Sequence, residues 1–181
     1  ATVLSTVTAG RLQKFTDHGA FAYQKIVKTI LDSIDGRHHH IGDLPESFIR
    51  ALRSHLKEHG IDPDRFVYLG SVPSLWEALK TMDAQVYIGS APTSGGYSPI
   101  EAQGCGYPVL PFNGFDVGSV LADLSFYAAP ELAWPDLETL GRTLKNIKPR
   151  LTELNQQARK FYEMNYSRSH FQNSLQKLMK A

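Results

Sequence analysis

The sequence predicts an α/β fold in which helices cover both faces of a doubly wound parallel sheet. Short β-branched and apolar runs alternate along the chain with longer segments whose apolar residues recur at helical spacing. No internal repeat, low-complexity tract or linker interrupts this alternation. A chain of 181 residues also suits one compact domain with a full hydrophobic core. We therefore expect a Rossmann-like domain at residues 1–165, followed by a C-terminal helix at residues 166–181.

The first half of the chain carries the signals of three strands and two helices. The strands are expected at residues 2–9, 37–41 and 66–69, and the helices at residues 18–34 and 45–59. Phe48, Leu52 and Leu56 form the apolar stripe of the second helix. Asp43 and Glu46 stand three residues apart just before this stripe, so we expect them to form a capping box.

The second half continues the alternation with shorter elements. Strands are expected at residues 85–88 and 108–111. Helices are expected at residues 74–81, 136–146, 148–163 and 167–180, and a further short helix is expected to begin near Ser98. Phe171, Leu175 and Leu178 are in register on the last helix, whose opposite face is charged.

Three loops are expected to meet at one edge of the sheet, because ligands of doubly wound folds bind beyond the carboxyl ends of the strands. They span residues 10–16, 70–74 and 90–98. The first loop carries Arg11 and Lys14. Charge-assisted hydrogen bonds from these two side chains could neutralise a bound diphosphate.

The segment from Thr93 to Leu110 is the most informative part of the chain. Gly95 and Gly96 let the backbone approach a bulky ligand and adopt angles that are closed to other residues. The first N–H groups of a helix have no internal partner, so we expect the helix that starts near Ser98 to favour an anion such as a diphosphate. Glu101, one turn further on, could accept both hydroxyls of a ribose. These features indicate a nucleotide-diphosphate pocket.

Three histidines in a row, His38 to His40, raise the question of a metal site. Neighbouring residues of a strand point to opposite faces, so at most His38 and His40 share a side. We expect them to pack within the sheet, and no metal site is predicted.

Composition excludes several other classes. With 19 basic and 18 acidic side chains the net charge is near zero, which argues against a nucleic-acid surface. No apolar run approaches the roughly 18 residues needed to span a bilayer, and we find no signal peptide. A single cysteine cannot form an internal disulfide, which favours the cytoplasm. The chain lacks an initiator Met and opens within a predicted strand, as we expect of a domain excised from a longer protein.

Four pieces of sequence together resemble the C-terminal, donor-binding half of GT-B glycosyltransferases, over nearly the whole chain. They are Gly10-Arg11-Leu12-Gln13-Lys14, His40-Ile41-Gly42-Asp43, Val67-Tyr68-Leu69-Gly70-Ser71-Val72-Pro73 and Glu101-Ala102-Gln103-Gly104-Cys105-Gly106-Tyr107-Pro108-Val109. Their order and spacing are similar to those of the retaining, group 1 type. The resemblance implies one half of a GT-B fold, with the acceptor site and any general base in a missing N-terminal half.

The resemblance also implies roles for individual residues. Arg11 and Lys14 would act in catalysis, by stabilising the negative charge that develops on the diphosphate as the glycosidic bond breaks. The residues that would bind the donor are Gly10 in the first loop, Ser71 and Val72 at the base, Thr93, Ser94, Gly95, Gly96, Tyr97 and Ser98 at the diphosphate and sugar, and Glu101 at the ribose. Such a site implies neither a metal nor a cofactor, only a nucleotide-sugar donor, most simply a UDP-linked one.

One position departs from the retaining pattern. That family usually carries a second glutamate eight residues before the ribose-binding one, and Thr93 stands there in this chain. In lacking this carboxylate the chain resembles the protein O-linked N-acetylglucosaminyltransferases. These enzymes have a hydroxyl-rich segment before a carboxylate, and Tyr97, Ser98 and Glu101 would occupy those places here. Gly10-Arg11-Leu12 and Glu101-Ala102 fit the retaining group better. Both relatives stay open, and with them the stereochemical outcome of transfer.

We therefore expect the nucleotide-sugar-binding domain of a glycosyltransferase that moves a hexose or N-acetylhexosamine to an acceptor. The isolated domain should be inactive, and the helix at residues 166–181 would pack against the missing half, which could also make any peripheral membrane contact. Two alternatives are a nucleotide-sugar 2-epimerase half-domain and a degenerate, non-catalytic nucleotide-binding or interaction module. Thr93 is the best argument for the degenerate module.

Overall fold

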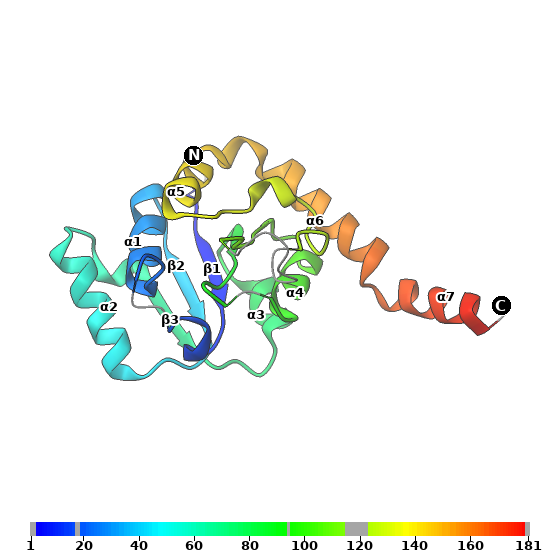
Figure 1. The fold of residues 1–181 in the computed structure, drawn as a ribbon, viewed down its shortest axis with the longest axis horizontal. Helices are drawn as coiled ribbons and strands as arrows, with labels where there is room; N and C mark the ends of the chain where they lie inside the picture. Colours follow the sequence, from blue (N-terminus) through cyan, green and yellow to red (C-terminus); the bar gives the residue numbers. More distant parts are fainter. Residues whose placement is uncertain (1–2, 17–18, 94, 115–122, 180–181) are drawn as a thin grey trace.

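The structure, a computed structural model, describes residues 3–16, 19–93, 95–114 and 123–179, and within them an all-parallel sheet of five strands. The strands are β1 (Thr6–Ala9), β2 (His38–Ile41), β3 (Phe66–Gly70), β4 (Val86–Ile88) and β5 (Val109–Leu110). Their order in the sheet is β3-β2-β1-β4-β5. Figure 1 shows β3, β2 and β1 side by side. This is the predicted doubly wound, Rossmann-like sheet.

Seven α-helices accompany the sheet in the described part of the chain. They are α1 (Tyr23–Ser33), α2 (Glu46–Glu58), α3 (Leu75–Thr81), α4 (Ser98–Gly104), α5 (Leu137–Asn146), α6 (Leu151–Asn165) and α7 (Arg168–Met179). Each predicted helix and strand is therefore present, although several are shorter than expected. The strand predicted at residues 108–111 has only two residues, for example.

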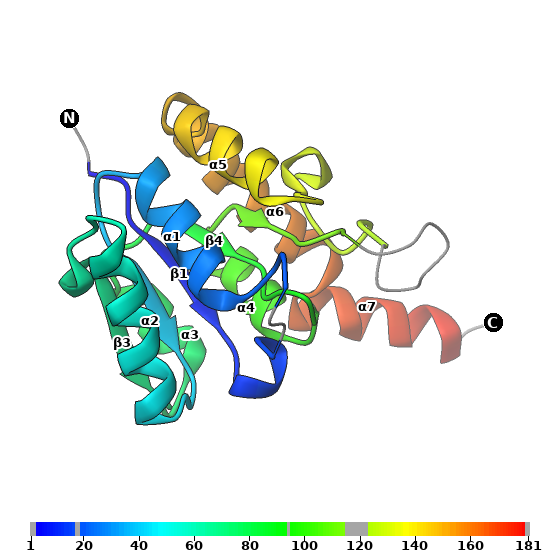
Figure 2. The same cartoon turned by 60° about the vertical axis from the view of Figure 1, so that its left-hand side comes forward.

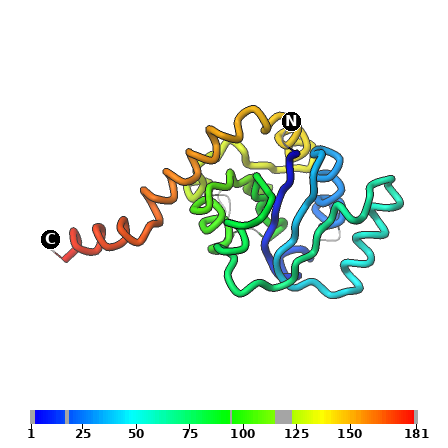
Figure 3. The backbone as a smooth tube through the Cα atoms, turned by 180° about the vertical axis from the view of Figure 1, so that it is seen from behind, coloured from blue at the N-terminus to red at the C-terminus, as the bar shows by residue number. Residues whose placement is uncertain are grey.

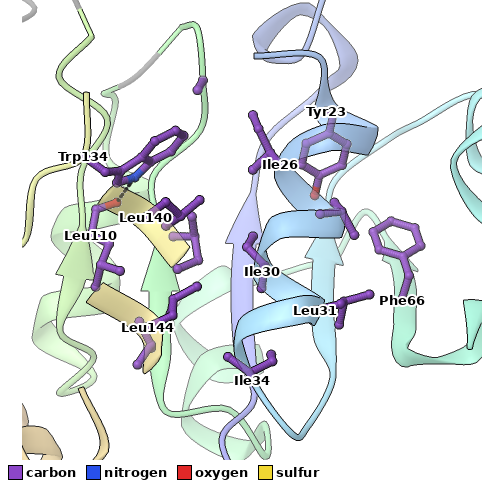
Figure 4. Packing of buried hydrophobic residues seen from close by; sticks show 14 of the residues in the cluster. Tyr23, Ile26, Ile30, Leu31, Ile34, Phe66, Leu110, Trp134, Leu140 and Leu144 are labelled. Atoms are coloured by element: carbon purple, nitrogen blue, oxygen red, sulfur yellow. Dashed lines mark hydrogen bonds between the residues drawn. The ribbon is translucent and has the colours of Figure 1, made fainter. Parts of the chain in front are cut away.

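The larger hydrophobic core lies on the face of the sheet that α1, α2 and α5 cover. Ile30 of α1 and Leu144 of α5 lie in this core together with alternate, inward-facing residues of the strands, such as Leu110 (Figure 4). Trp134 closes this core, and its indole Nε1 donates a hydrogen bond to the carbonyl of Leu110 at 3.0 Å. Figure 2 shows α1 and α5 side by side above the strands.

The opposite face carries a smaller core beneath α3 and α4. Val7, Tyr87 and Val109 point to this side, because they alternate with the residues that face the larger core. Ala102 of α4 packs onto them, and α6 lies against the outside of α4. The helices thus cover both faces of the sheet, as predicted.

The predicted capping box of α2 is wrong. Pro45 is the N-cap residue, and no side chain caps the helix there. The ψ of Pro45 is 145°, an extended conformation, so the helix begins only at Glu46 and Asp43 lies outside it. Asp43 instead accepts a hydrogen bond from the hydroxyl of Ser71 at 2.8 Å. The residue expected to cap a helix therefore joins two loops at the ligand edge of the sheet.

The last helix extends away from the body of the domain (Figure 3). The stripe predicted for it is exposed, with Phe171 at 66 % and Leu178 at 75 % of full accessibility. No helix of the described residues is long and apolar enough to cross a bilayer.

Candidate functional site

Topology places the candidate site between the carboxyl ends of β1 and β4. The chain runs outward from β1 through β2 to β3, then returns to the other side of β1 to form β4 and β5. Strand order therefore reverses between β1 and β4, which are paired in parallel. In open α/β sheets this point of reversal leaves a crevice in which ligands bind. The loops that begin at Gly10 and Gly89 border it.

Hydrogen bonds join the loops on the β1 side of the crevice into one layer. The amide of Leu12 donates to the carbonyl of Asp43 at 3.2 Å, and the amide of Gly42 donates to the carbonyl of Gly70 at 2.8 Å. The hydrogen bond between Ser71 and Asp43 continues the same layer. The first loop is thus held in place by hydrogen bonds within the layer that it forms with the two loops that follow β2 and β3.

Lys14 connects this layer with the glycine-rich loop across the crevice. The segment Leu12–Lys14 forms a single turn of 3₁₀ helix, and Lys14 Nζ then donates a hydrogen bond to the carbonyl of Gly95 at 3.0 Å. The φ angles of Gly95 and Gly96 are +90° and +88°, so both glycines occupy conformations that other residues rarely adopt. Partial burial lowers the pKa of the Lys14 ammonium from its ordinary value of 10.5. Arg11 is exposed at the start of the same turn.

Glu101 lies in the first turn of α4 and is partly buried, which raises the pKa of its carboxyl group. The helix itself is a weak anion site. It has only seven residues, and Pro99 in its first turn has no N–H to offer. The ammonium group of Lys14, rather than the dipole of this short helix, therefore supplies the positive charge that the structure places beside the glycine-rich loop.

The remaining predicted residues of the glycine-rich loop are largely solvent-accessible. Tyr97 is 83 % exposed, and Thr93 is exposed while its carbonyl accepts a hydrogen bond from Ser90 at 2.7 Å. Ser98 hydrogen bonds through its side chain with Tyr87. Ser94 lies outside the described residues.

The two residues predicted at the base differ in their surroundings. Ser71 is exposed, and its hydroxyl is held by Asp43. Val72 is partly buried and packs against the smaller hydrophobic core. A base at this loop would therefore meet backbone and the exposed Ser71 rather than a deep side-chain pocket.

Tyr87 is a site residue that sequence reasoning missed. It is fully buried, yet its hydroxyl lies 3.3 Å from the amide nitrogen of Ala9 and donates to the Ala9 carbonyl at 3.4 Å. Burial raises the pKa of Tyr87 well above its usual value, so the hydroxyl stays neutral. Through Ala9 and Ser98 it connects the end of β1 with the start of α4. The only signal in the sequence was a hydroxyl within an otherwise apolar strand that precedes the site.

His38 and His40 are buried within the sheet, as predicted for one strand face. Among the described residues, no group of three or more His, Cys, Asp and Glu side chains could hold a metal ion.

No protein-family model and no curated protein sequence matches this chain. Solved structures do match. A mutant O-GlcNAc transferase of Thermobaculum terrenum has a TM-score of 0.74 at 20 % identity, over 99 % of this chain and 36 % of its own. HepE of Anabaena, solved in complex with UDP, has a TM-score of 0.71 at 12 % identity, over 100 % of this chain and 50 % of its own.

The catalytic domain of a cholesterol-α-glucosyltransferase of Helicobacter pylori matches with a TM-score of 0.63 at 16 % identity, over 90 % of this chain and 99 % of that domain. This chain thus spans about a third of the O-GlcNAc transferase and half of HepE. Identities this low establish the fold and leave the activity to be argued from the site. The chain has the fold of one of the two domains of a GT-B glycosyltransferase.

Proposed function

We propose that this chain is the donor-binding domain of a glycosyltransferase, and that its donor is a nucleotide-diphosphate sugar, UDP-linked in the simplest case. The contact of Lys14 Nζ with Gly95 carries this proposal. It places an ammonium group in the crevice at which strand order reverses, against a loop whose two glycines leave room for a bulky ligand. HepE, one of the structural neighbours, was solved with UDP, which supports the choice of nucleotide.

Each part of the donor would be bound by a different side chain of the site. Lys14 and Arg11 would neutralise the diphosphate, and because a bound anion favours the ammonium form, it would reverse the lowered pKa of Lys14. Glu101 would accept the ribose hydroxyls as a carboxylate. Stabilising the charge on the leaving diphosphate is the contribution to catalysis that these residues could make.

The acceptor and any general base would belong to the rest of a longer protein. The exposed row on α7, formed by Phe171, Leu175 and Leu178, would be covered by that part. We propose transfer of a hexose or an N-acetylhexosamine by the complete enzyme, and no activity for this domain alone. Thr93 favours a second candidate, a nucleotide-binding module that has lost catalysis, because its side chain offers no carboxylate to the donor sugar. Binding of UDP by the full-length protein without transfer or donor hydrolysis would support that candidate.

Replacing Lys14 by alanine is expected to weaken UDP binding about 10- to 100-fold, the range for loss of a hydrogen bond to a charged group. Calorimetric titration of UDP, GDP and ADP measures this and identifies the base. Lys25→Ala is the matched control, because Lys25 Nζ also donates to a glycine carbonyl at 3.0 Å, that of Gly19 on an exposed turn. Equal affinities of the two variants, or no binding of any of the three nucleotides even by the full-length protein, would contradict the proposal.

The Glu101→Gln variant is expected to lose the preference of the domain for UDP over 2′-deoxy-UDP. The carboxylate of Glu101 could accept both ribose hydroxyls, whereas an amide offers a single acceptor oxygen. We expect an affinity loss of about fivefold to tenfold for UDP and a smaller one for the deoxy analogue. If the variant keeps the wild-type preference, Glu101 is not the ribose ligand. Glu77→Gln, on the exposed surface of α3, serves as the control.

A further inference from the structure

A chain of buried polar side chains runs beneath the loop that carries Lys14. Thr6 Oγ1 lies 2.8 Å from His38 Nδ1, and His38 Nε2 lies 3.2 Å from the hydroxyl of Tyr23. That hydroxyl lies 2.7 Å from His40 Nδ1, and His40 Nε2 lies 3.1 Å from the carbonyl oxygen of Gly10. All four side chains are at most 1 % exposed.

The hydrogen bonds along this series of polar side chains can run in only one direction. The carbonyl of Gly10 only accepts, so His40 must carry its proton on Nε2 and accept from Tyr23 on Nδ1. The single hydrogen of the Tyr23 hydroxyl is then used, so Tyr23 must accept from His38 Nε2, and His38 Nδ1 must accept from Thr6. Both rings are neutral at pH 7, because burial lowers the pKa of His40 to about 4 and that of His38 well below its usual value. Each ring nitrogen thus has one partner.

A second contact holds the other end of the loop on the same two side chains. Phe15 directly follows Lys14 and is buried, with its ring centroid 4.3 Å from that of Tyr23 and 5.2 Å from that of His40. A Cβ atom on Gly10 would lie only 2.9 Å from the Phe15 ring, so the two ends of the loop also meet each other.

We propose that Tyr23 and His40 are positioning residues that set the place of Lys14 in the donor site. They fix the loop at Gly10 through a hydrogen bond and at Phe15 through ring packing, which leaves Lys14 held between two anchored residues. An apolar pair could fill the same space but could not restrain a carbonyl group, whereas a fully satisfied polar network favours one geometry. This proposal rests on the proposed function, since the diphosphate is what Lys14 would be positioned to bind.

The test compares Tyr23→Phe with Tyr107→Phe. Each variant removes one buried hydroxyl that donates a hydrogen bond. The hydroxyl of Tyr107 donates to the carbonyl of Leu79 at 2.8 Å, on the opposite face of the sheet. The first readout is the NMR tautomer of both histidines in the wild-type chain, expected to be the neutral form with the proton on Nε2. A proton on Nδ1 of His40 would overturn the proposal, because that nitrogen faces Tyr23 and not Gly10.

The second readout is the amide signals of Gly10 and Lys14 together with the affinity for UDP. Tyr23→Phe should shift both signals and weaken UDP binding about threefold to tenfold, the size expected for one lost hydrogen bond, and Tyr107→Phe should change neither. If Tyr23 had a purely structural role, the two variants would have the same effect on the amide signals and on the affinity for UDP. That result would refute the proposal. If even the full-length protein binds no nucleotide, the proposed function fails on its own, and the tautomers and amide signals still decide whether Tyr23 and His40 hold the loop.

Discussion

Acidification from pH 7 to pH 5 is expected to lower the free energy of unfolding by about 2 kcal/mol through His40 alone, given its fall in pKa from 6.5 to about 4 on folding. Between these two values the unfolded chain binds a proton that the folded chain does not. Stability is therefore fully present above pH 6.5 and is lost progressively as the pH falls toward 4. His38 contributes in the same direction, because burial lowers its pKa as well.

The neighbours of the two rings explain why protonation is so unfavourable. Their hydrogen-bond partners are neutral groups, namely the hydroxyls of Thr6 and Tyr23 and the carbonyl of Gly10. A second proton on either ring would have to replace the hydrogen bond that its accepting nitrogen receives, so the charge would be buried with one contact broken.

Urea unfolding at pH 7, 6 and 5 measures this loss, and NMR titration of the His40 ring gives its pKa directly. A free energy of unfolding that stays constant down to pH 5, or a His40 pKa near 6.5, would contradict the prediction.

The Gly42→Ala variant is expected to lose about 3 kcal/mol or more of stability, a size associated with overpacking and backbone strain combined. A Cβ atom on Gly42 would lie 2.2 Å from the carbonyl oxygen of Gly10, a distance that forces one backbone to move. The φ angle of Gly42 is +119°, which adds strain for any residue with a side chain. Since Gly10 begins the loop that carries Lys14, the movement should also weaken UDP binding.

Gly60→Ala separates the two causes. Gly60 also has a positive φ, +73°, but a Cβ atom there would meet nothing within 4 Å. We expect this variant to lose only about 1–2 kcal/mol, the strain of a left-handed conformation alone. Thermal and urea unfolding of both variants measure the difference. Similar losses in the two would show that the contact with Gly10 does not matter.

Local patterns were enough to predict the fold. Helical spacing and β-branched runs located every α-helix and strand that the structure describes, and the predicted glycines at 95 and 96 belong to the loop that Lys14 contacts. The capping box failed because Pro45 sets the start of α2, and spacing alone does not show whether a carboxylate will find a nearer partner in another loop, as Asp43 does.

The parts that were missed depend on contacts between distant segments. Tyr87 and the chain from Thr6 to His40 gain their roles from pairing between strands and from the direction in which α1 presents Tyr23. No local pattern shows which hydroxyl will meet which ring nitrogen across 15 or more residues of sequence. For the same reason the histidine run could be assigned to packing, while its connection to Gly10 could not be foreseen.

The exposed stripe of α7 gives the isolated chain an apolar surface through which copies of it can associate. Phe171 and Leu178 project from a helix that extends beyond the body of the domain, so they add little to the core. Two molecules at high concentration can cover these stripes with each other, because apolar area removed from water is favourable whichever surface removes it. Monomers and weakly associated dimers should therefore coexist, in a ratio set by protein concentration rather than by the stability of the fold.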